Sequence, residues 1–169
     1  MANVSLDNLH DCRRCPRLVE HMASVKPRRG LAADDYWNGP VAGFGDPAAR
    51  VFLIGLAPRA HGANRTGRPF TGDGAGDFMY PLLHQAGFAS QAEASHADDG
   101  LRLDDLYISN AVKCLPPDNK PNAAEFTNCR PYLLSEQQRL KRLKVVILLG
   151  RGAYDSYLRL YRERGGSSD

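Results

Sequence analysis

The stretch VFLIG, residues 51–55, decides the fold. It is an apolar run of strand length bounded by turn-forming residues, which is typical of a buried parallel strand. Two comparable runs occur further along the chain, LYISN at 106–110 and VVILL at 145–149. We therefore expect three buried strands, separated by segments long enough to hold helices.

Helices are expected at residues 76–87, ending at Gly87, at 123–142, where Pro131 could interrupt the helix, and at 151–163. This alternation predicts an α/β fold with three layers, α/β/α, around a central parallel sheet with right-handed crossovers. A helical stretch interrupted by the CRRCP turn is expected at 5–22, and loops are expected at 27–48 and 88–103. We expect residues 1–164 to form a single domain, followed by a disordered tail at 165–169.

The composition is that of an ordinary globular protein. The chain has 169 residues, 43% of them hydrophobic, and no apolar stretch approaches the length that crosses a membrane. The N-terminus, MANVSLDNLHDC, lacks the pattern of a secretory leader, so we expect a cytoplasmic location. The net charge of +3 favours no particular partner. Three basic clusters suit either phosphate contacts or solvated surface: Arg13, Arg14 and Arg17; Lys26, Arg28 and Arg29; and Arg139, Lys141, Arg142 and Lys144.

All the cysteines belong to one spacing pattern, Cys12-x2-Cys15 followed by Cys114 and Cys129. Without a secretory leader, such a CxxC pair is more often metal-binding or redox-active than disulfide-bonded. A structural zinc site usually offers two close pairs, and here the second pair is widely spaced. The pattern therefore favours an iron–sulfur cluster that ties three segments together over zinc, and favours both over four unrelated buried thiols.

The unusual segments all follow strand ends. A long glycine-rich stretch, residues 56–76, follows the first strand, and its length indicates a functional loop. Asn110 closes the second strand, with Cys114 just beyond, and Gly150 closes the third. Since ligands bind beyond the carboxyl ends of strands in open α/β sheets, we expect these segments to converge there.

Three features together resemble one enzyme family: GLAPRAHGANRTGRPFTGD at 55–73, SNAVKC at 109–114, and the four cysteines. The combination is similar to the iron–sulfur uracil-DNA glycosylases of bacteria and archaea, most of all to type 5, also called uracil-DNA glycosylase B. The related type 4 family has an acidic residue in its first motif, where this chain has Leu56-Ala57-Pro58.

The resemblance implies a monomeric enzyme that initiates base excision repair by hydrolysing the N-glycosidic bond of uracil, and of other deaminated bases, in uracil-containing DNA. It also implies a 4Fe-4S cluster bound by Cys12, Cys15, Cys114 and Cys129. A monofunctional mechanism is expected because no lysine stands in the matched motifs to form a Schiff base; the nearest, Lys113, neighbours a cysteine.

A glycosylase must extrude its nucleotide into a pocket, and three residues suit that pocket. Phe70 could stack on the base, or could instead cover the sheet edge as a core residue. The amide of Asn110 can match the adjacent O4 and N3–H of uracil, or could bond to turn backbone. Asp73 could stabilise the cation that develops on the sugar and orient a water, while also capping the next helix.

Further residues of the first motif are assigned roles in base or phosphate binding, with less support from the chemistry of their side chains. The resemblance implies that Gly55, Ala57 and His61 help to bind the base. Arg65 and Arg68 could contact phosphate or the pocket, with solvated loop positions as an equal alternative.

The chain departs from the family in one respect. Family members continue with a further strand and a His-Pro-Ser type motif that supplies a histidine to the active site. This chain has no His-Pro dipeptide, and its histidines, at 10, 21, 61, 84 and 96, all precede the third strand. We therefore expect this chain to lack the last strand of the family. The chain is then either a fragment of a longer protein or an enzyme of impaired activity. A non-catalytic iron–sulfur DNA-binding module of the same fold is the alternative.

Overall fold

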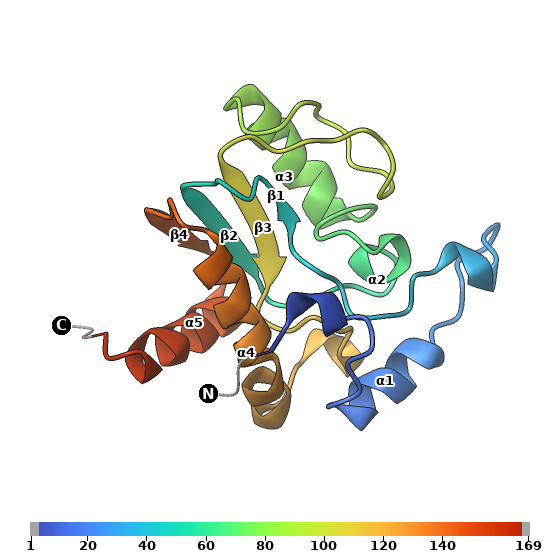
Figure 1. Ribbon diagram of the computed structural model, residues 1–169. Coiled ribbons are helices and arrows are strands. Elements are labelled where there is room, and N and C mark those ends of the chain that lie inside the picture. Colours follow the sequence, from blue (N-terminus) through green and yellow to red (C-terminus); the bar gives the residue numbers. More distant parts are fainter. Residues whose placement is uncertain (1–3, 167–169) are drawn as a thin grey trace.

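A computed structural model describes residues 4–166 and contains one four-stranded sheet in the order β1-β3-β2-β4 (Figure 1). The strands are β1 (Phe44–Gly45), β2 (Val51–Gly55), β3 (Leu106–Asn110) and β4 (Val145–Leu148). Strand β2 lies between β3 and β4 and pairs in parallel with both, so Gly55 is opposite Asn110 and Ile54 is opposite Leu148. The three predicted strands are confirmed, with β4 ending one residue early.

Strand β1 was not predicted, and it makes the sheet mixed rather than wholly parallel. It pairs antiparallel with β3 inside the segment that was expected to be a loop. Gly45 adopts φ +137°, and a Cβ on it would lie 2.3 Å from the carbonyl oxygen of Leu106. A strand of two residues has no hydrophobic periodicity, so the prediction of a loop was wrong here for a local reason.

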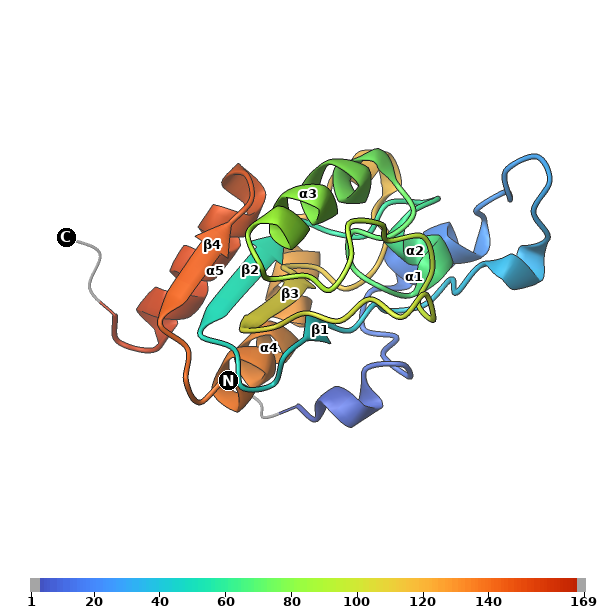
Figure 2. The ribbon, with the colours of Figure 1, turned by 90° about the horizontal axis from the view of Figure 1, so that it is seen from above.

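The sheet is the middle of three layers (Figures 1 and 2). Helices α4 (Ala123–Arg139) and α5 (Arg151–Glu163) cover one face, where Phe52 and Ile54 pack in one core. Helix α3 (Gly74–Gln85) and the 88–103 loop cover the other face, where Leu53 and Ile108 pack around the buried Tyr80. Successive residues of β2 thus enter opposite cores, as the alternation of side chains along a strand requires.

The remaining helices are short apart from α1 (Pro16–Ala23), which was expected as part of the N-terminal helical stretch. Helix α2 (Ala63–Thr66) is one turn inside the glycine-rich loop and was not predicted. Three 3-10 turns complete the fold: η1 (Leu6–Asn8), η2 (Ala33–Asp35) and η3 (Pro117–Asn119).

Helix α4 continues through Pro131, so the break left open there does not occur. Its buried face, which includes Cys129, Tyr132 and Leu133, packs on the rest of the protein. Such packing, rather than local propensity, supplies most of the stability of a helix and compensates for the hydrogen bond that a proline removes.

The N-terminal segment is docked onto the loop after β3. Leu18 and Met22 of α1 pack in a third core with Val112, Leu115, Cys114 and Cys129. Arg17 donates to the buried carboxylate of Glu125 at 2.7 Å, which joins α1 to the start of α4. Distant parts of the chain therefore meet around the cysteines.

At the C-terminal end, Gly166 donates to the carbonyl of Tyr161, so the first residues of the predicted tail are bound to the last turn of α5; residues 167–169 lie outside the described residues. Within residues 4–166, no helix is both long and apolar enough to cross a membrane. The assignment of 1–164 to a single domain stays a prediction.

Replacing Phe52 with alanine tests the role of the sheet in stability. Phe52 is fully buried between β2 and α4–α5, so the change should lower the free energy of unfolding by about 3–5 kcal/mol. The matched control is Phe78→Ala on α3, whose side chain is 74% exposed and whose loss should cost about 0.5 kcal/mol or less. Urea unfolding measures both, and equal losses would contradict this description of the core.

Candidate active site

A cavity lies at the carboxyl edge of the sheet, where the three parallel strands end. Gly55 ends β2, Asn110 ends β3 and Leu149 follows β4, and all three line this cavity. Five of the predicted site residues are in its wall: Gly55, Ala57, Phe70, Asp73 and Asn110. The expected convergence of the strand ends is therefore present.

Phe70 and Asn110 are brought together at Gly55. A Cβ on Gly55 would lie 2.5 Å from Cζ of Phe70 and 2.6 Å from Oδ1 of Asn110, so any larger residue would displace one of them. Phe70 itself has φ +53°, which is unusual for a bulky residue and costs conformational energy. Its carbonyl group closely approaches Gly76, where a Cβ would clash. The ring of Phe70 is thus held beside the amide of Asn110 by the close approaches at Gly55 and at Gly76.

Asp73 is the N-cap of α3, as anticipated. Its Oδ1 accepts hydrogen bonds from the backbone N–H groups of Ala75 and Gly76, each at 3.1 Å. Its Oδ2 lies against Gly62, where a Cβ would be only 2.0 Å away. The helix N-terminus stabilises the negative charge of the carboxylate. The capping role and a place in the cavity wall are therefore compatible.

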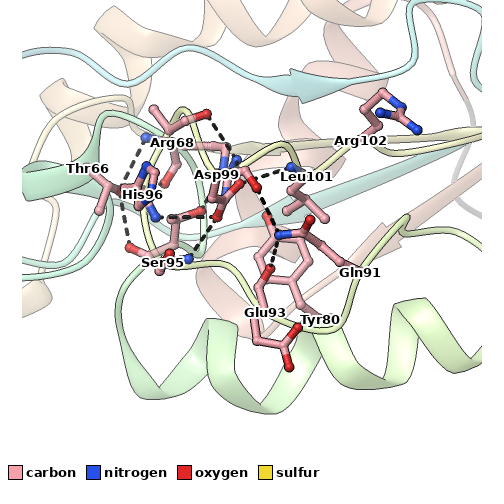
Figure 3. A network of polar contacts seen from close by, with 12 residues as sticks. Thr66, Arg68, Tyr80, Gln91, Glu93, Ser95, His96, Asp99, Leu101 and Arg102 are labelled. Carbon is pink, nitrogen blue, oxygen red and sulfur yellow. Dashed lines mark hydrogen bonds and ion pairs between the residues drawn. The ribbon is translucent and has the colours of Figure 1, made fainter.

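A buried ion pair anchors the segment that carries Phe70 and Asp73 (Figure 3). Arg68 is 4% exposed and donates to both oxygens of Asp99 at 2.8 and 2.7 Å. Its Nε donates to Thr71 at 2.9 Å, and its guanidinium lies over the ring of Phe44. Arg68 is therefore neither a solvated loop residue nor free to contact phosphate, and it is not among the residues that line the cavity; it joins the motif to the 88–103 loop.

The environment of Asp99 favours its charged form. Burial pushes the pKa of this carboxyl upward, but hydrogen bonds from Arg68, Leu101 and Ser95 outweigh burial and hold the pKa well below its usual range. In Figure 3 the carboxylate accepts from Ser95 and Leu101 of its own loop and from Arg68 of the glycine-rich stretch. Asp99 is thus a fixed anion that closes its own loop as well as binding Arg68.

His61 is not among the residues that line the cavity. Its Nδ1 lies 2.8 Å from the hydroxyl oxygen of Tyr36, in the segment before β1. The pKa of His61 is lowered by burial and by the positive charges of Arg28 and Arg65, which favours the neutral ring at neutral pH. The structure thus places His61 between two loops and outside the wall of the cavity.

Asn119 lines the cavity, and sequence reasoning did not single it out. It follows Pro116, Pro117 and Asp118, and both Asp118 and Asn119 have positive φ, at +53° and +55°. Asparagine and aspartate tolerate this region better than other non-glycine residues, so the sequence Asp-Asn after two prolines is a turn signal. That signal predicts the turn but says nothing about the cavity that the turn approaches.

The cysteines from three separate segments line one small cavity, together with Arg14, Lys113 and Asn128. Asn128 Nδ2 lies 3.4 Å from Sγ of Cys15, and the backbone N–H of Lys113 donates to Sγ of Cys129 at 3.4 Å. Burial raises the pKa of Cys129 to about 12 and raises that of Cys114 further. All four thiols therefore line one cavity, with Cys114 and Cys129 buried and Cys12 and Cys15 half-buried.

The fit of this cavity to a metal depends on the kind of metal centre. Within residues 4–166, no group of three or more His, Cys, Asp or Glu side chains could hold a metal ion. A tetrahedral zinc ion would require sulfur atoms about 3.8 Å apart. A cluster distributes its thiolates over several iron atoms and needs a wider arrangement, with N–H donors to the sulfurs. The all-thiol lining, with N–H donors to two of the sulfurs, is a ligand set that fits an iron–sulfur cluster.

An aromatic ring, an amide and a carboxylate thus line one cavity at the carboxyl edge of an α/β sheet, which is where such folds bind ligands. Residues 42–168 match the family model described as the uracil DNA glycosylase superfamily. The chain is 49% identical over 154 residues to a type-5 uracil-DNA glycosylase of Thermus thermophilus, covering 90% of this chain and 70% of that protein.

Two further relatives, both from one organism, allow the type-5 and type-4 glycosylases to be compared with this chain. A type-5 uracil-DNA glycosylase of Pyrobaculum aerophilum is 41% identical over 155 residues, covering 92% of this chain and 68% of that protein. A type-4 uracil-DNA glycosylase of the same organism is 33% identical over 114 residues, covering 67% of this chain and 50% of that protein. The chain belongs to the uracil-DNA glycosylase superfamily, and it is more similar to the type-5 than to the type-4 relative.

Replacing Asp99 with asparagine tests the ion pair that anchors the motif. The change leaves Arg68 buried without its counter-charge and should lower the free energy of unfolding at pH 7 by about 3 kcal/mol. Because the pKa of Asp99 is lowered in the folded state, its contribution is complete above the unfolded pKa. The difference between the two proteins should therefore shrink as the pH falls below about 4.

Urea unfolding at several pH values measures this difference. The neighbouring exposed Asp98 provides the control, since Asp98→Asn should change stability little at any pH. A difference between wild type and Asp99→Asn that does not depend on pH would rule out the proposed charge on Asp99.

Proposed function

We propose that this protein is a monofunctional DNA glycosylase that hydrolyses the bond between uracil and deoxyribose and so starts base excision repair. The observation that carries the proposal is the shared cavity of Phe70, Asn110 and Asp73 at the carboxyl edge of the sheet. The family and the names of its relatives support the same substrate. We further propose that it acts as a monomer in the cytoplasm on uracil-containing DNA.

In the proposed mechanism the uracil nucleotide leaves the DNA stack and enters the cavity. The ring of Phe70 provides a stacking face, and the amide of Asn110 both donates and accepts, which matches the O4 and N3–H of uracil. Gly55 supports this assignment because it leaves room for both side chains at the same point. Gly55 and Ala57 then contribute backbone and a small side chain, so the base can approach closely.

Asp73 is assigned to the chemical step. As the N-glycosidic bond breaks, positive charge develops on the sugar, and a nearby carboxylate stabilises it and can orient the attacking water. Its Oδ1 is occupied by the backbone of α3, which leaves Oδ2 for this task. The described residues that line the cavity include no lysine, which supports hydrolysis rather than a Schiff-base intermediate.

The range of bases follows from the first motif. Leu56, Ala57 and Pro58 line the cavity where the type 4 family has an acidic residue, so this part of the wall carries no charge. An uncharged wall discriminates less strictly between base edges, which supports excision of other deaminated bases besides uracil.

The cysteines are proposed to bind a 4Fe-4S cluster through Cys12, Cys15, Cys114 and Cys129. Such a cluster would supply a covalent connection between α1, the loop after β3 and α4, without taking part in cleavage. Asn128 and the backbone of Lys113 would donate to its sulfur ligands. Its role would therefore be to hold the loop between Asn110 and Asn119 in place.

Replacing Asp73 with asparagine tests the catalytic assignment. Asparagine is as good an N-cap as aspartate, so folding should be preserved while the charge is lost. Release of uracil from an oligonucleotide under single-turnover conditions should slow by about 10²–10⁴-fold. Asp77→Asn, an exposed position in the first turn of the same helix, is the matched control and should retain the wild-type rate.

An unchanged rate in Asp73→Asn would exclude this residue from the chemistry. Binding of uracil-containing DNA by the wild type without any release of base would identify a binding module instead.

Anaerobic purification tests the metal assignment. We expect a brown protein with about four iron atoms and matching acid-labile sulfide per chain, and Cys114→Ser should lose both. Because α1 depends on this region for its packing, the variant should also unfold at lower urea concentration. A colourless wild-type protein containing stoichiometric zinc would contradict the cluster.

A further inference from the structure

A fully buried ion pair includes Lys113, which lines the cysteine cavity and donates to the carbonyl of Asn110 at the other cavity. Lys113 and Glu136 have no exposed side-chain surface, and Nζ of Lys113 lies 2.6 Å from Oε2 of Glu136. Burying two charges costs several kcal/mol per ion, so such a pair is often no more stabilising than two apolar residues of the same size. Its presence therefore calls for a role other than stability.

Every donor of the ammonium group has a partner. Besides Glu136, Nζ donates to the hydroxyl of Ser109 and, at 2.8 Å, to the main-chain carbonyl of Asn110. The carboxylate of Glu136 also accepts from Ser109 and from the backbone N–H of Gly43, each at 3.0 Å. The network is fully connected, which is the condition under which a buried polar network holds one conformation.

The network acts directly on the residue that is assigned to base recognition. Asn110 is the last residue of β3, and the following residue, Ala111, donates to Gly55 of β2 at 2.8 Å. The carbonyl group of Asn110 itself accepts a hydrogen bond from Nζ of Lys113. The backbone sets the direction of the Cα–Cβ bond and limits the rotamers of the side chain, so the ammonium group and the neighbouring strand together restrict where the amide of Asn110 can point.

The same lysine also contacts the cysteine cavity. Its backbone N–H donates to Cys129, and the next residue is Cys114. Lys113 thus has its backbone at one cavity and its ammonium group bound to the strand end that lines the other.

We propose that Lys113 and Glu136 are positioning residues that set the discrimination of the site for uracil by fixing the orientation of Asn110. This inference rests on the proposed function, in which Asn110 recognises the base edge. Without the pair, the backbone at the end of β3 would sample other orientations, and the amide would match uracil only part of the time.

The test replaces both partners at once, because removing one would leave an unpaired buried charge and risk unfolding. The variant Lys113→Met/Glu136→Met leaves Ser109, Gly43 and the carbonyl of Asn110 without these partners, so it should unfold at a lower urea concentration than wild type while staying folded without denaturant, which circular dichroism checks. Its single-turnover release of uracil should slow about tenfold or more. In an Asn110→Ala background the same double change should slow release by less than about twofold, because the side chain that it positions is already absent.

A second readout does not require cleavage. Equilibrium binding of an oligonucleotide with a non-hydrolysable 2′-fluoro-deoxyuridine is compared with one carrying 2′-fluoro-deoxycytidine at the same position, because cytosine presents an amino group and an unprotonated N3 where uracil presents O4 and N3–H. The double variant should lose most of the preference for uracil over cytosine. The control, Arg130→Met/Glu163→Met, removes an ion pair between α4 and α5 and should leave the preference unchanged.

The outcomes separate the two proposals. If wild type releases no uracil but its binding preference falls in the double variant, positioning stands and the enzymatic function fails. An equal loss with and without the Asn110 side chain, or a double variant that matches wild type in both assays, would overturn the positioning role.

Discussion

Strand β2 is hydrogen-bonded on both sides to parallel neighbours, and the geometry of the site depends on this arrangement. Parallel pairing makes the three strands end at the same edge of the sheet, so Gly55, Asn110 and Leu149 reach one cavity although they are far apart in sequence. Both faces of β2 are buried, which holds its register: a slip by one residue would exchange the cores on the two faces.

Above this edge, the glycine-rich loop is held by contacts that leave its reactive groups available. Asp73 caps α3 with one oxygen, and the Arg68–Asp99 pair joins the loop to the layer that covers the sheet. Phe70, whose φ of +53° is unfavourable for a bulky residue, lies in the chain between these two anchored residues, Arg68 and Asp73. Because the segment around Phe70 is anchored, its aromatic ring is presented to the cavity in one orientation.

The polar network of Lys113 and Glu136 connects the cavity at the sheet edge to the cysteines, because Lys113 donates to Asn110 with its ammonium group and to Cys129 with its backbone N–H. The same loop carries Asn110, Lys113 and Cys114 within five residues, and it is bounded by the exposed turn that carries Asn119. A cluster bound by the cysteines would therefore stabilise both amides of the site through a short segment of backbone, without contacting the base.

Local pattern was sufficient for the three long strands and for both ends of α5, since an apolar run and a positive-φ glycine are signals carried by a few adjacent residues. It was less exact for α3, which begins and ends two residues before the predicted 76–87, and for α4, which ends three residues before the predicted 142. Family motifs likewise indicated Phe70, Asp73 and Asn110, which the fold brings together. The two-residue β1, the burial of Arg68, the place of His61 beside Tyr36 and the approach of Asn119 to the cavity had no such signal. Each of them is set by a partner distant in the chain, and the choice of that partner is a matter of packing in three dimensions rather than of neighbouring residues.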